Sequence, residues 1–396
     1  MNIVVGVTGS IAAYKAVDLV NRLGKMGHHV RVVMTAHAAD FVRPLTFEAI
    51  SHEKVITDMF NDGAPALAHI DLAKWADCCM VAPCDANVIA KLAHGLADDF
   101  LTTFILAFDG PVLVAPAMNT VMYHQKVTQD NLALLKSYGY EVVAPASGKL
   151  ACGDIGEGKL ADIDTLLFHI EKSLAAQPLK GFRLVVTAGP TIAPIDPVRF
   201  VTNHSSGKMG FSIAHEAALR GAEVTLVAGN VQRNTPIGVE RVDVSTTEEM
   251  LNALSHLMPR ADGLVMAAAP ADYIPAEYHK EKIKKAGETL TIDFKKNPDI
   301  LKSLRPLLDD KIVVGFAAES HQLLQNAERK LIEKNLDFIV ANNIAGENSA
   351  FQSDYNAATI LYKDGRQESV ARQLKTRLAD KILDEIQTLK SQKEVR

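Results

Sequence analysis

The sequence is poor in the features that mark secreted, membrane-spanning and nucleic-acid-binding proteins. Its 396 residues hold only four cysteines and no CxxC pair, so no disulfide framework is indicated and a reducing compartment is expected. No stretch of about 18 uncharged apolar residues occurs, which argues against a membrane-spanning helix. The formal net charge of -5 lacks the basic excess that phosphate backbones recruit, so nucleic acid is not an expected partner.

The first residues also lack a basic start, a long apolar segment and a small-residue cleavage site. We therefore do not interpret them as a signal peptide, and the cytoplasm is the expected location. Cys78, Cys79 and Cys84 lie in or beside an apolar run that is typical of a buried strand, so we interpret them as small core residues.

The length of the chain predicts more than one domain, because a single hydrophobic core rarely serves so many residues. Small residues together with Pro178 and Gly181 mark a linker at residues 175–181. We expect one domain at residues 1–178 and a second at residues 181–396.

In the first domain, short apolar runs alternate with stretches of helical periodicity. Strands are expected at residues 3–8, 30–35, 78–83, 112–117 and 141–145, and helices at residues 11–26, 47–51, 87–93, 130–138 and 163–175. Buried strands that alternate with helices indicate a doubly wound parallel sheet. Such a sheet binds ligands at the carboxyl ends of its strands, so the segments that follow strands are the first places to look for function.

The same pattern restarts in the second domain. Strands are expected at residues 183–187, 224–228, 264–268, 312–316 and 338–341, and helices ending near residue 220 and at residues 248–258, 323–335 and 370–390. The predicted fold class is therefore α/β, with two doubly wound, mostly parallel, Rossmann-like sheets, the first of them flavodoxin-like.

A glycine-bearing turn follows the first expected strand. Gly9 permits a tight turn and Ser10 can cap the next helix, so the helix N-terminus makes a natural phosphate site. The GxGxxG spacing is absent, which argues against a dinucleotide. Thr35, at the end of the second strand, is expected to bind the same cofactor.

Three further segments carry side chains that suit catalysis. His69 precedes the strand at residues 78–83, and Asn119 ends the strand at residues 112–117. Cys152 lies in a glycine-rich loop that can close over a substrate and donate a proton. A lone histidine is usually a surface residue, so we consider His69 a candidate catalytic residue only together with Asn119 and Cys152.

In this order and spacing, Gly9-Ser10, His69, Pro116–Asn119 and Ala151–Gly156 resemble the flavin-dependent cysteine decarboxylases, and closely the decarboxylase half of the bacterial bifunctional coenzyme A enzymes. The resemblance implies FMN as cofactor, with oxidation of a cysteinyl thiol, loss of carbon dioxide and return of the hydride. It also implies that His69 sits beside the flavin, that Asn119 holds the substrate carboxylate or amide, and that Cys152 donates the last proton.

The second domain presents another set of polar segments after its strands. Asn203–Gly210 (NHSSGKMG) is not a Walker loop, but its serines, glycines and amides open a helix and suit a phosphate or acyl-phosphate group. A single lysine is best interpreted as a solvated surface residue. Several lysines around one sheet edge, with Asp272 to hold Mg²⁺, favour a triphosphate site instead.

Together these segments resemble the bacterial phosphopantothenate–cysteine ligases, whose nucleotide is CTP. The resemblance implies that 4'-phosphopantothenate attacks the α-phosphate to give an acyl-cytidylate, from which the amine of cysteine displaces CMP. It implies a catalytic contact from Asn203 to the acyl group. The implied nucleotide contacts are Met266, Ala267, Ala268, Asp272, Lys282, Pro298, Asp299, Ile300, Leu301, Phe316, Lys330 and Lys334.

Two other functions fit parts of the sequence. A peptide-modifying flavin decarboxylase would share His69 and Asn119 but would need neither Cys152 nor a ligase domain. A non-catalytic regulatory flavoprotein would be expected to lack Cys152 or the lysines. The resemblance further implies flavin-domain trimers and ligase-domain dimers, which together generate a dodecamer by symmetry.

Overall fold

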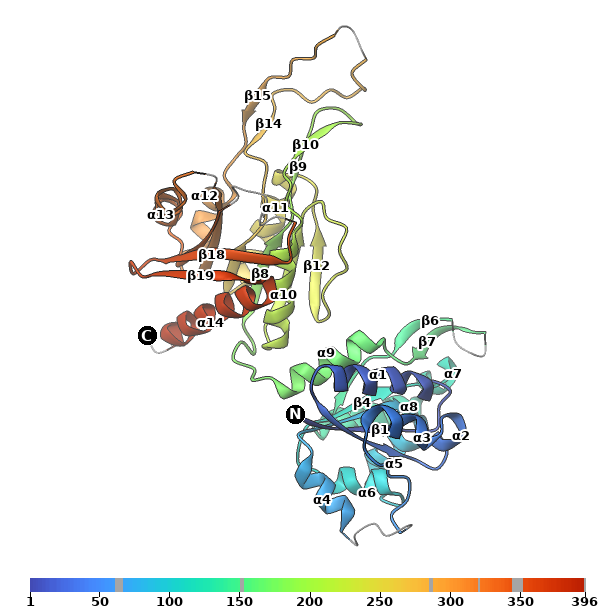
Figure 1. Cartoon of the computed structure of the whole chain (residues 1–396). Helices are drawn as coiled ribbons and strands as arrows, with labels where there is room; N and C mark the ends of the chain where they lie inside the picture. Colours follow the sequence, from blue (N-terminus) through green and yellow to red (C-terminus); the bar gives the residue numbers. More distant parts are fainter. Residues whose placement is uncertain (61–66, 150–152, 285–287, 320, 344–351, 395–396) are drawn as a thin grey trace. The chain divides into compact units, whose positions relative to one another are not determined.

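The computed structural model describes residues 1–60, 67–149, 153–284, 288–319, 321–343 and 352–394. They form two compact units, Met1–Ala176 and Gln177–Arg396. Figure 1 shows that each unit contains a sheet with helices packed against it. Within the described ranges, no helix combines the length and the apolar character that a membrane crossing requires.

The first unit is built on a five-stranded parallel sheet in the order β2-β1-β3-β4-β5. Its strands are β1 (Asn2–Val7), β2 (His29–Met34), β3 (Cys78–Cys84), β4 (Val112–Pro116) and β5 (Glu141–Val142). All seven residues of β3 are buried, as expected for a strand covered on both faces. This flavodoxin-like order reverses direction between β1 and β3, which opens a crevice at the carboxyl ends.

Helices cover both faces of this sheet and form a separate hydrophobic cluster on each. One cluster joins α1, α3 and α9, and the other joins α4, α5, α6 and α8. The helices are α1 (Ala13–Lys25), α2 (Ala38–Phe41), α3 (Pro44–Ser51), α4 (Ala68–Trp75), α5 (Ala86–His94), α6 (Phe100–Ala107), α7 (Thr120–His124), α8 (Lys126–Ser137) and α9 (Ile163–Leu174). An antiparallel hairpin, β6 (Ala146–Lys149) with β7 (Ile155–Lys159), stands outside the sheet.

The second unit contains an eight-stranded sheet in the order β12-β11-β8-β13-β16-β17-β18-β19. Its strands are β8 (Arg183–Ala188), β11 (Glu223–Ala228), β12 (Val239–Asp243), β13 (Gly263–Met266), β16 (Ile312–Glu319), β17 (Phe338–Asn343), β18 (Tyr355–Tyr362) and β19 (Gln367–Leu374). The sheet is parallel as far as β17, and β18 and β19 add an antiparallel hairpin at one edge. The predicted fold class, two mostly parallel α/β sheets, is confirmed.

One face of this sheet carries α11, α12 and α13, which share a hydrophobic cluster with it, while α10 and α14 pack against each other. These helices are α10 (Lys208–Leu219), α11 (Thr247–Leu257), α12 (Ile300–Leu304), α13 (Leu323–Glu333) and α14 (Lys375–Glu394), with 3-10 turns at Met258–Arg260 and Arg305–Leu307.

Two expectations about helix limits are wrong. The helix expected at residues 370–390 begins only at Lys375, because Val370 lies in β19. Most side chains of this edge strand are exposed, so its polar sequence resembles the outer face of a helix. Ser10 does not cap α1 either: the helix begins at Ala13, and the Ser10 hydroxyl accepts a hydrogen bond from the Ala12 amide at 3.3 Å.

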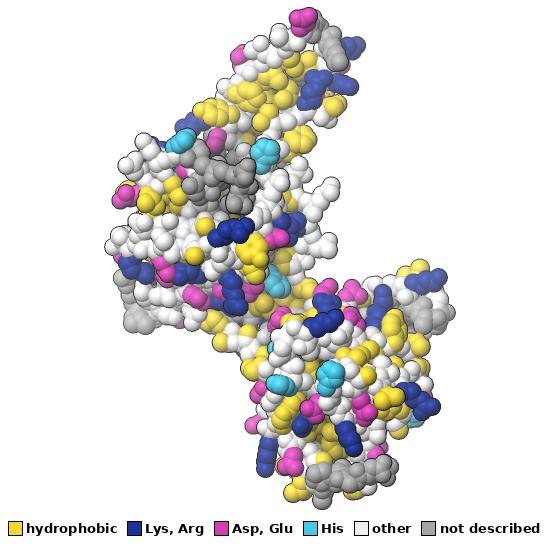
Figure 2. All heavy atoms as spheres, in the orientation of Figure 1, with side chains coloured by type: hydrophobic (Ala, Val, Ile, Leu, Met, Phe, Trp, Pro, Cys, Tyr) yellow, Lys and Arg dark blue, Asp and Glu magenta, His cyan; other side chains and the backbone are white. Residues whose placement is uncertain are grey.

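A long arm leaves the second sheet between β13 and β16 (Figure 1). It contains the antiparallel pair β14 (Tyr273–Pro275) and β15 (Phe294–Lys296), and a second pair, β9 (Ile192–Pro194) with β10 (Phe200–Thr202), lies near its base. Figure 2 shows hydrophobic side chains gathered along the arm. The exposed apolar residues of these segments are Val198, Phe200, Val201, Tyr273, Tyr278, Leu290 and Phe294.

Candidate functional sites

The first cavity lies at the carboxyl ends of β1, β3 and β4 and has a volume of about 590 Å³. Its walls come from the turn after β1, the start of α1, the ends of β3 and β4, and the β6–β7 hairpin. The lining includes Gly9, Ser10, Lys15, Asp85, Met118, Asn119, Lys149 and Lys159. The sheet crevice expected from the strand order is therefore an open ligand-sized cavity.

The turn after β1 and the loop after β2 meet closely at one end of this crevice. A Cβ on Gly9 would lie 2.7 Å from the Cβ of His37, so only glycine allows this approach. Thr35 lies two residues before His37, and its buried Oγ1 has no hydrogen-bond partner. Thr35 is not among the residues that line the cavity, so its predicted contact with the cofactor stays a prediction.

Asn119 connects the end of β4 to the hairpin. As the N-cap of α7, its Oδ1 accepts a hydrogen bond from the Val121 amide at 2.8 Å. Its Nδ2 donates to the Oδ2 of Asp154 at 3.2 Å, next to β7. Gly158 of β7 approaches the chain so closely that a Cβ there would lie 2.4 Å from the Met118 carbonyl oxygen. The hairpin is thus held against the cavity beside Asn119.

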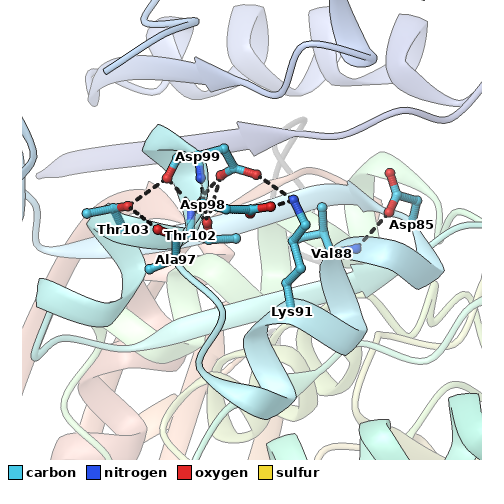
Figure 3. Close-up of polar contacts among 8 residues, drawn as sticks. All are labelled: Asp85, Val88, Lys91, Ala97, Asp98, Asp99, Thr102 and Thr103. Atoms are coloured by element: carbon cyan, nitrogen blue, oxygen red, sulfur yellow. Dashed lines mark hydrogen bonds and ion pairs between the residues drawn. The ribbon is translucent and has the colours of Figure 1, made fainter. Parts of the chain in front are cut away.

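The segment after β3 forms a rigid frame for the same cavity. The Asp85 amide donates to the Thr8 hydroxyl at 2.8 Å, and its Oδ1 accepts from the Val88 amide at 2.8 Å, which caps α5. Figure 3 shows Lys91 of α5 reaching toward Asp98 and Asp99, with N–O distances of 2.7 and 3.2 Å. The two hydrogen bonds of Asp85 fix the turn that carries it, and Asp85 is a lining residue that the sequence analysis did not assign.

The structure does not bring His69 to this cavity. His69 lies on α4, which packs against α6, and neither helix contributes to the cavity lining. Cys152 lies outside the described residues. The other three cysteines are buried core residues, as predicted. Burial raises the pKa of Cys78 to about 11, so this thiol stays protonated and unreactive.

A second cavity, of about 360 Å³, lies at the carboxyl ends of β13 and β16 in the other unit. Four separate segments supply most of the residues that the sequence singled out: the region after β13, the start of α12, β16, and α13 with its C-cap. The expected residues that line it are Met266, Ala268, Asp272, Pro298, Asp299, Ile300, Leu301, Phe316, Lys330 and Lys334.

Two of the lysines in this wall are already held by carboxylates. Lys330 pairs with the Oε1 of Glu319 at 2.7 Å, and Lys334 pairs with the Oδ2 of Asp299 at 3.1 Å. Burial opposes ionisation of Asp299, but Lys334 outweighs it and the pKa of the carboxyl is lowered. Both ammonium groups are therefore oriented along the wall before any ligand arrives.

A third cavity, of about 400 Å³, adjoins the second. The two share Ala268, Pro270, Asp272, Phe316 and Lys330 as wall residues. Ala267 and the loop that begins at Asn203 line the third cavity. The Nδ2 of Asn203 donates to the carbonyl oxygens of Ala269 at 2.9 Å and Pro270 at 3.2 Å. Asn203 therefore stands where the two cavities meet.

Lys282 is not brought to either cavity within one chain. It is exposed on the segment between β14 and β15 and is absent from both cavity linings. The neighbouring Ile283 is anchored, because its amide donates to the Oδ2 of Asp196 at 3.1 Å and its carbonyl accepts from Arg199 at 3.0 Å.

Sequence reasoning missed Asn342, Asn356 and Lys375, which line the third cavity. Asn356 belongs to β18, and Lys375 begins α14 directly after β19. The alternation of buried and exposed residues along β18 was the available signal for this hairpin. Among the residues that the structure describes, no group of three or more His, Cys, Asp or Glu side chains is arranged to hold a metal ion.

The fold and cavities define a class: a two-domain α/β protein with ligand-sized cavities at the carboxyl ends of both sheets. Residues 1–175 match the family described as Flavoprotein, and residues 179–389 match the family described as DNA/pantothenate metabolism flavoprotein C-terminal domain.

Full-length relatives carry the same pair of domains. The coenzyme A biosynthesis bifunctional protein CoaBC of Escherichia coli K12 is 44% identical over 395 residues, covering 98% of this chain and 96% of the relative. CoaBC of Bacillus subtilis 168 is 42% identical over 396 residues, covering 99% and 98%. CoaBC of Vibrio cholerae serotype O1 is 44% identical over 385 residues, covering 96% of each.

Solved structures resemble each half of the chain. The C-terminal domain of a CoaBC protein is 37% identical, with a TM-score of 0.48, covering 55% of this chain and 100% of that domain. A PPC decarboxylase mutant complexed with pantothenoylaminoethenethiol is 32% identical, with a TM-score of 0.40, covering 43% and 95%.

The chain belongs to the CoaBC family of bifunctional coenzyme A biosynthesis enzymes, which join a phosphopantothenoylcysteine decarboxylase to a phosphopantothenate–cysteine ligase. The enzyme class predicted from the sequence, a decarboxylase fused to a ligase, is confirmed.

Proposed function

We propose that residues 1–178 decarboxylate 4'-phosphopantothenoylcysteine with FMN, and that residues 181–396 make this substrate from 4'-phosphopantothenate, cysteine and CTP. The observation that carries the proposal is the pair of distinct cavities. One is a flavodoxin-type crevice beside the Gly9-Ser10 turn, and the other is a cleft with oriented lysines and the carboxylates of Asp272 and Asp299 in its lining.

The first cavity fits a flavin mononucleotide. Its volume of about 590 Å³ lies within the usual range for small-molecule sites. The Gly9-Ser10 turn and the start of α1 would hold the phosphate, and Thr35 would gain the hydrogen bond that its Oγ1 lacks. When bound, FMN would accept a hydride from the carbon that carries the cysteinyl thiol and would later return that hydride.

The chain's own groups then orient and protonate the substrate. The Nδ2 of Asn119 can exchange its bond to Asp154 for one to the substrate carboxylate or amide, which places the thiol toward the flavin side of the cavity. The β6–β7 hairpin would exclude water from this side. Cys152 would then donate a proton to the enethiolate, which becomes the final thiol once the reduced flavin has also returned its hydride.

His69 needs a different explanation, because α4 lies away from the cavity of its own chain. We assign His69 to the cavity of a neighbouring copy, which agrees with a trimer of flavin domains. Exposed apolar side chains beside the cavity, Ile11, Tyr14 and Met122, suit such a contact. The apolar arm of the second unit suits a dimer of ligase domains, so that a dodecamer follows by symmetry.

The joined second and third cavities fit CTP and the acyl intermediate. Pro298, Ile300 and Leu301 would surround the nucleoside, and Lys330, Lys334 and Asp272 belong to the same lining. Mg²⁺ usually binds one or two carboxylates together with substrate phosphates, and Asp272 fits that pattern as the protein ligand. Lys282, on the arm, would neutralise phosphate charge once the arm of either copy covers the cleft.

Asn203 would act in the second half of the ligation. Its amide stands where the two cavities meet, so it can donate to the acyl oxygen as the cysteine amine attacks. The carboxylate oxygen first bonds to the α-phosphorus and pyrophosphate leaves. The amine then bonds to the acyl carbon, and CMP leaves with the electron pair of the broken bond.

The nucleotide assignment is tested with purified protein, 4'-phosphopantothenate, cysteine and Mg²⁺, supplied in turn with CTP, ATP, GTP or UTP. We expect pyrophosphate release and amide formation with CTP at low concentration. Faster turnover with ATP at matched concentrations would contradict the assignment.

A further inference from the structure

A buried carboxylate lies at the base of the arm, outside the cavities described above. Asp196 belongs to the turn between β9 and β10, and its side chain is 0% exposed. It is not among the residues that line the three cavities. A carboxylate is costly to bury unless hydrogen bonds and an opposite charge compensate it, so the partners of Asp196 indicate its role.

The two carboxylate oxygens of Asp196 hold different parts of the chain. Oδ1 accepts hydrogen bonds from the amides of Val198 and Arg199, both at 2.8 Å, which closes the turn. Oδ2 accepts a hydrogen bond from the Ile283 amide at 3.1 Å and pairs with the Arg199 guanidinium at 3.2 Å. One oxygen therefore fixes the turn, and the other fixes the arm.

The same turn holds the arm at further points around Lys282. The Arg199 guanidinium donates to the Ile283 carbonyl at 3.0 Å, so both polar backbone groups of Ile283 are bound. The His279 amide donates to the Ile195 carbonyl at 3.0 Å. Lys282 lies between these anchors, and its side chain is exposed. The backbone that carries Lys282 is therefore fixed, while its ammonium group is accessible to a ligand.

The hairpin that provides these anchors is attached to the body of the second unit. The Ile192 amide of β9 donates to the Ser245 carbonyl at 2.9 Å, and β9 packs against β14 at the base of the arm (Figure 1). Asn203 follows directly after β10. The position of Lys282 is therefore set by the hairpin that also leads to Asn203, and not by the exposed part of the arm beyond it.

We propose that Asp196 is a positioning residue for the ligase reaction, which acts through the Ile283 backbone to hold Lys282 in place for the triphosphate of the nucleotide. The proposal rests on the assignment of Lys282 to the nucleotide phosphates in the proposed function. A lysine on a loose surface segment would lose conformational freedom each time it bound a phosphate. The anchored backbone has already lost that freedom on folding, so Lys282 binds the phosphate with a smaller entropy cost.

A carboxylate that served only its own turn would need no contact with the arm. Asp364, in the turn between β18 and β19, is such a case: its Oδ1 accepts from the Arg366 amide at 3.0 Å and its Oδ2 pairs with the Arg366 side chain at 2.7 Å. Both interactions are with a residue two positions along the chain. The Oδ2 of Asp196 instead bonds to a residue 87 positions away, which a turn does not require.

Asp196→Asn separates the two roles. The amide oxygen can still close the turn, but the amide nitrogen would face the Ile283 amide and the Arg199 guanidinium, which are also donors. In the full-length protein with 4'-phosphopantothenate, cysteine and Mg²⁺, kcat/KM for CTP in pyrophosphate release should fall about ten- to hundredfold, the effect of a misplaced group. Asp364→Asn makes the same change in a similar turn and should leave this value unchanged.

A comparison of single and double variants shows whether Asp196 acts through Lys282. Lys282→Gln alone should lower kcat/KM for CTP. Adding Asp196→Asn to Lys282→Gln should lower it no further, because the positioned ammonium group is already absent. A further loss by the full factor that Asp196→Asn causes alone would overturn the proposal, since Asp196 would then act on the fold or on another group. Thermal unfolding of each variant checks the fold.

Amide hydrogen exchange observes the anchor directly. In the wild type the amides of His279 and Ile283 should exchange slowly, and Asp196→Asn should speed their exchange without changing that of β13. If Asp196→Asn fails to fold, Ile283→Pro removes the donor from the arm and leaves the buried carboxylate in place, so it should lower kcat/KM for CTP in the same way. Fast exchange of both amides in the wild type, or an unchanged kcat/KM in a folded Ile283→Pro protein, would contradict the anchor.

Failure of the proposed function would give a different result. A Lys282→Gln protein with the wild-type kcat/KM for CTP would refute the assignment of Lys282 to the nucleotide, even with both arm amides protected from exchange. Impaired Lys282→Gln together with additive losses in the double variant would instead refute the role of Asp196 and leave the assignment of Lys282 standing.

Discussion

Asn203→Ala should separate activation of the substrate from formation of the amide. In the structure the Nδ2 of Asn203 donates to the carbonyl oxygens of Ala269 and Pro270, at the meeting point of the two cavities. An amide in this position can turn to the acyl oxygen when negative charge develops there. The activation step takes place at the α-phosphorus and does not need this donor.

The magnitudes of the structural and catalytic effects differ enough to be distinguished. The side chain is exposed, so loss of its hydrogen bonds should cost only about 0.5–1.5 kcal/mol of unfolding free energy each. Loss of one donor that stabilises a developing oxyanion costs roughly 3 kcal/mol, or about a hundredfold in rate. The variant should therefore stay folded at assay temperature while amide formation slows strongly.

A single-turnover assay measures both steps. Asn203→Ala should release pyrophosphate from CTP and 4'-phosphopantothenate at nearly the wild-type rate and should accumulate acyl-cytidylate, detected by mass spectrometry. Asn2→Ala is a matched control, because it removes an amide that donates to the Trp75 carbonyl at 2.9 Å in the other unit. A folded Asn203→Ala protein that makes no pyrophosphate would refute the reasoning and would place Asn203 in nucleotide binding or activation.

Three other predictions test the remaining parts of the account. The purified protein should be yellow, heat should release FMN, and Thr35→Val should retain the flavin less tightly because Thr35 would donate to its phosphate; FAD in the released fraction would contradict the assignment. Cys152→Ser should leave pyrophosphate release intact and should accumulate the oxidised, decarboxylated enethiol with the flavin reduced, whereas a normal yield of 4'-phosphopantetheine would exclude the proton-donor role. Lys334 lowers the pKa of Asp299, so the pair stabilises the fold above the unfolded pKa of aspartate, about 3.9, and this contribution is lost as the pH falls through the lower folded pKa. As the pH is lowered, the melting temperature of Asp299→Asn should therefore fall less steeply than that of the wild type. Equal slopes of melting temperature against pH for the two proteins would contradict a stabilising Asp299–Lys334 pair.

The buried strands and the loops that follow them were predictable because their local patterns match their tertiary roles. The run that forms β3 is apolar at nearly every position, and the segments after β4 and β13 carry the expected Asn119 and Asp272. Parallel sheets bring such segments together at one edge, so the linings of the first two cavities followed from the order of the strands.

The edge hairpin was not predictable in the same way. β19 has a mostly exposed, polar sequence, so neither face supplies the apolar alternation that identifies a strand. The strand forms by pairing with β18, and a search for helical periodicity does not detect such pairing between strands. Missing this hairpin hid Asn356 and Lys375, and with them one end of the third cavity.

His69 and Lys282 illustrate a different limit. The order of the sequence motifs predicted that both residues lie in active sites. In the structure His69 lies on α4 and Lys282 lies on the segment after β14, and neither residue lines a cavity of its own chain. Sequence spacing carries no information about which copy of the chain supplies a side chain. Cross-complementation of His69→Ala with Cys152→Ser in mixed assemblies would reveal such sharing, because a mixed site can recover both residues.

The most direct test of the central claim is conversion of 4'-phosphopantothenate to 4'-phosphopantetheine by the purified protein. With cysteine, CTP and Mg²⁺ present, mass spectrometry should detect 4'-phosphopantetheine, with pyrophosphate, CMP and carbon dioxide formed in equal amounts. Omission of CTP should abolish all four products, and removal of FMN should stop the sequence at 4'-phosphopantothenoylcysteine. Formation of 4'-phosphopantetheine without CTP, or its continued formation by flavin-free protein, would contradict the account.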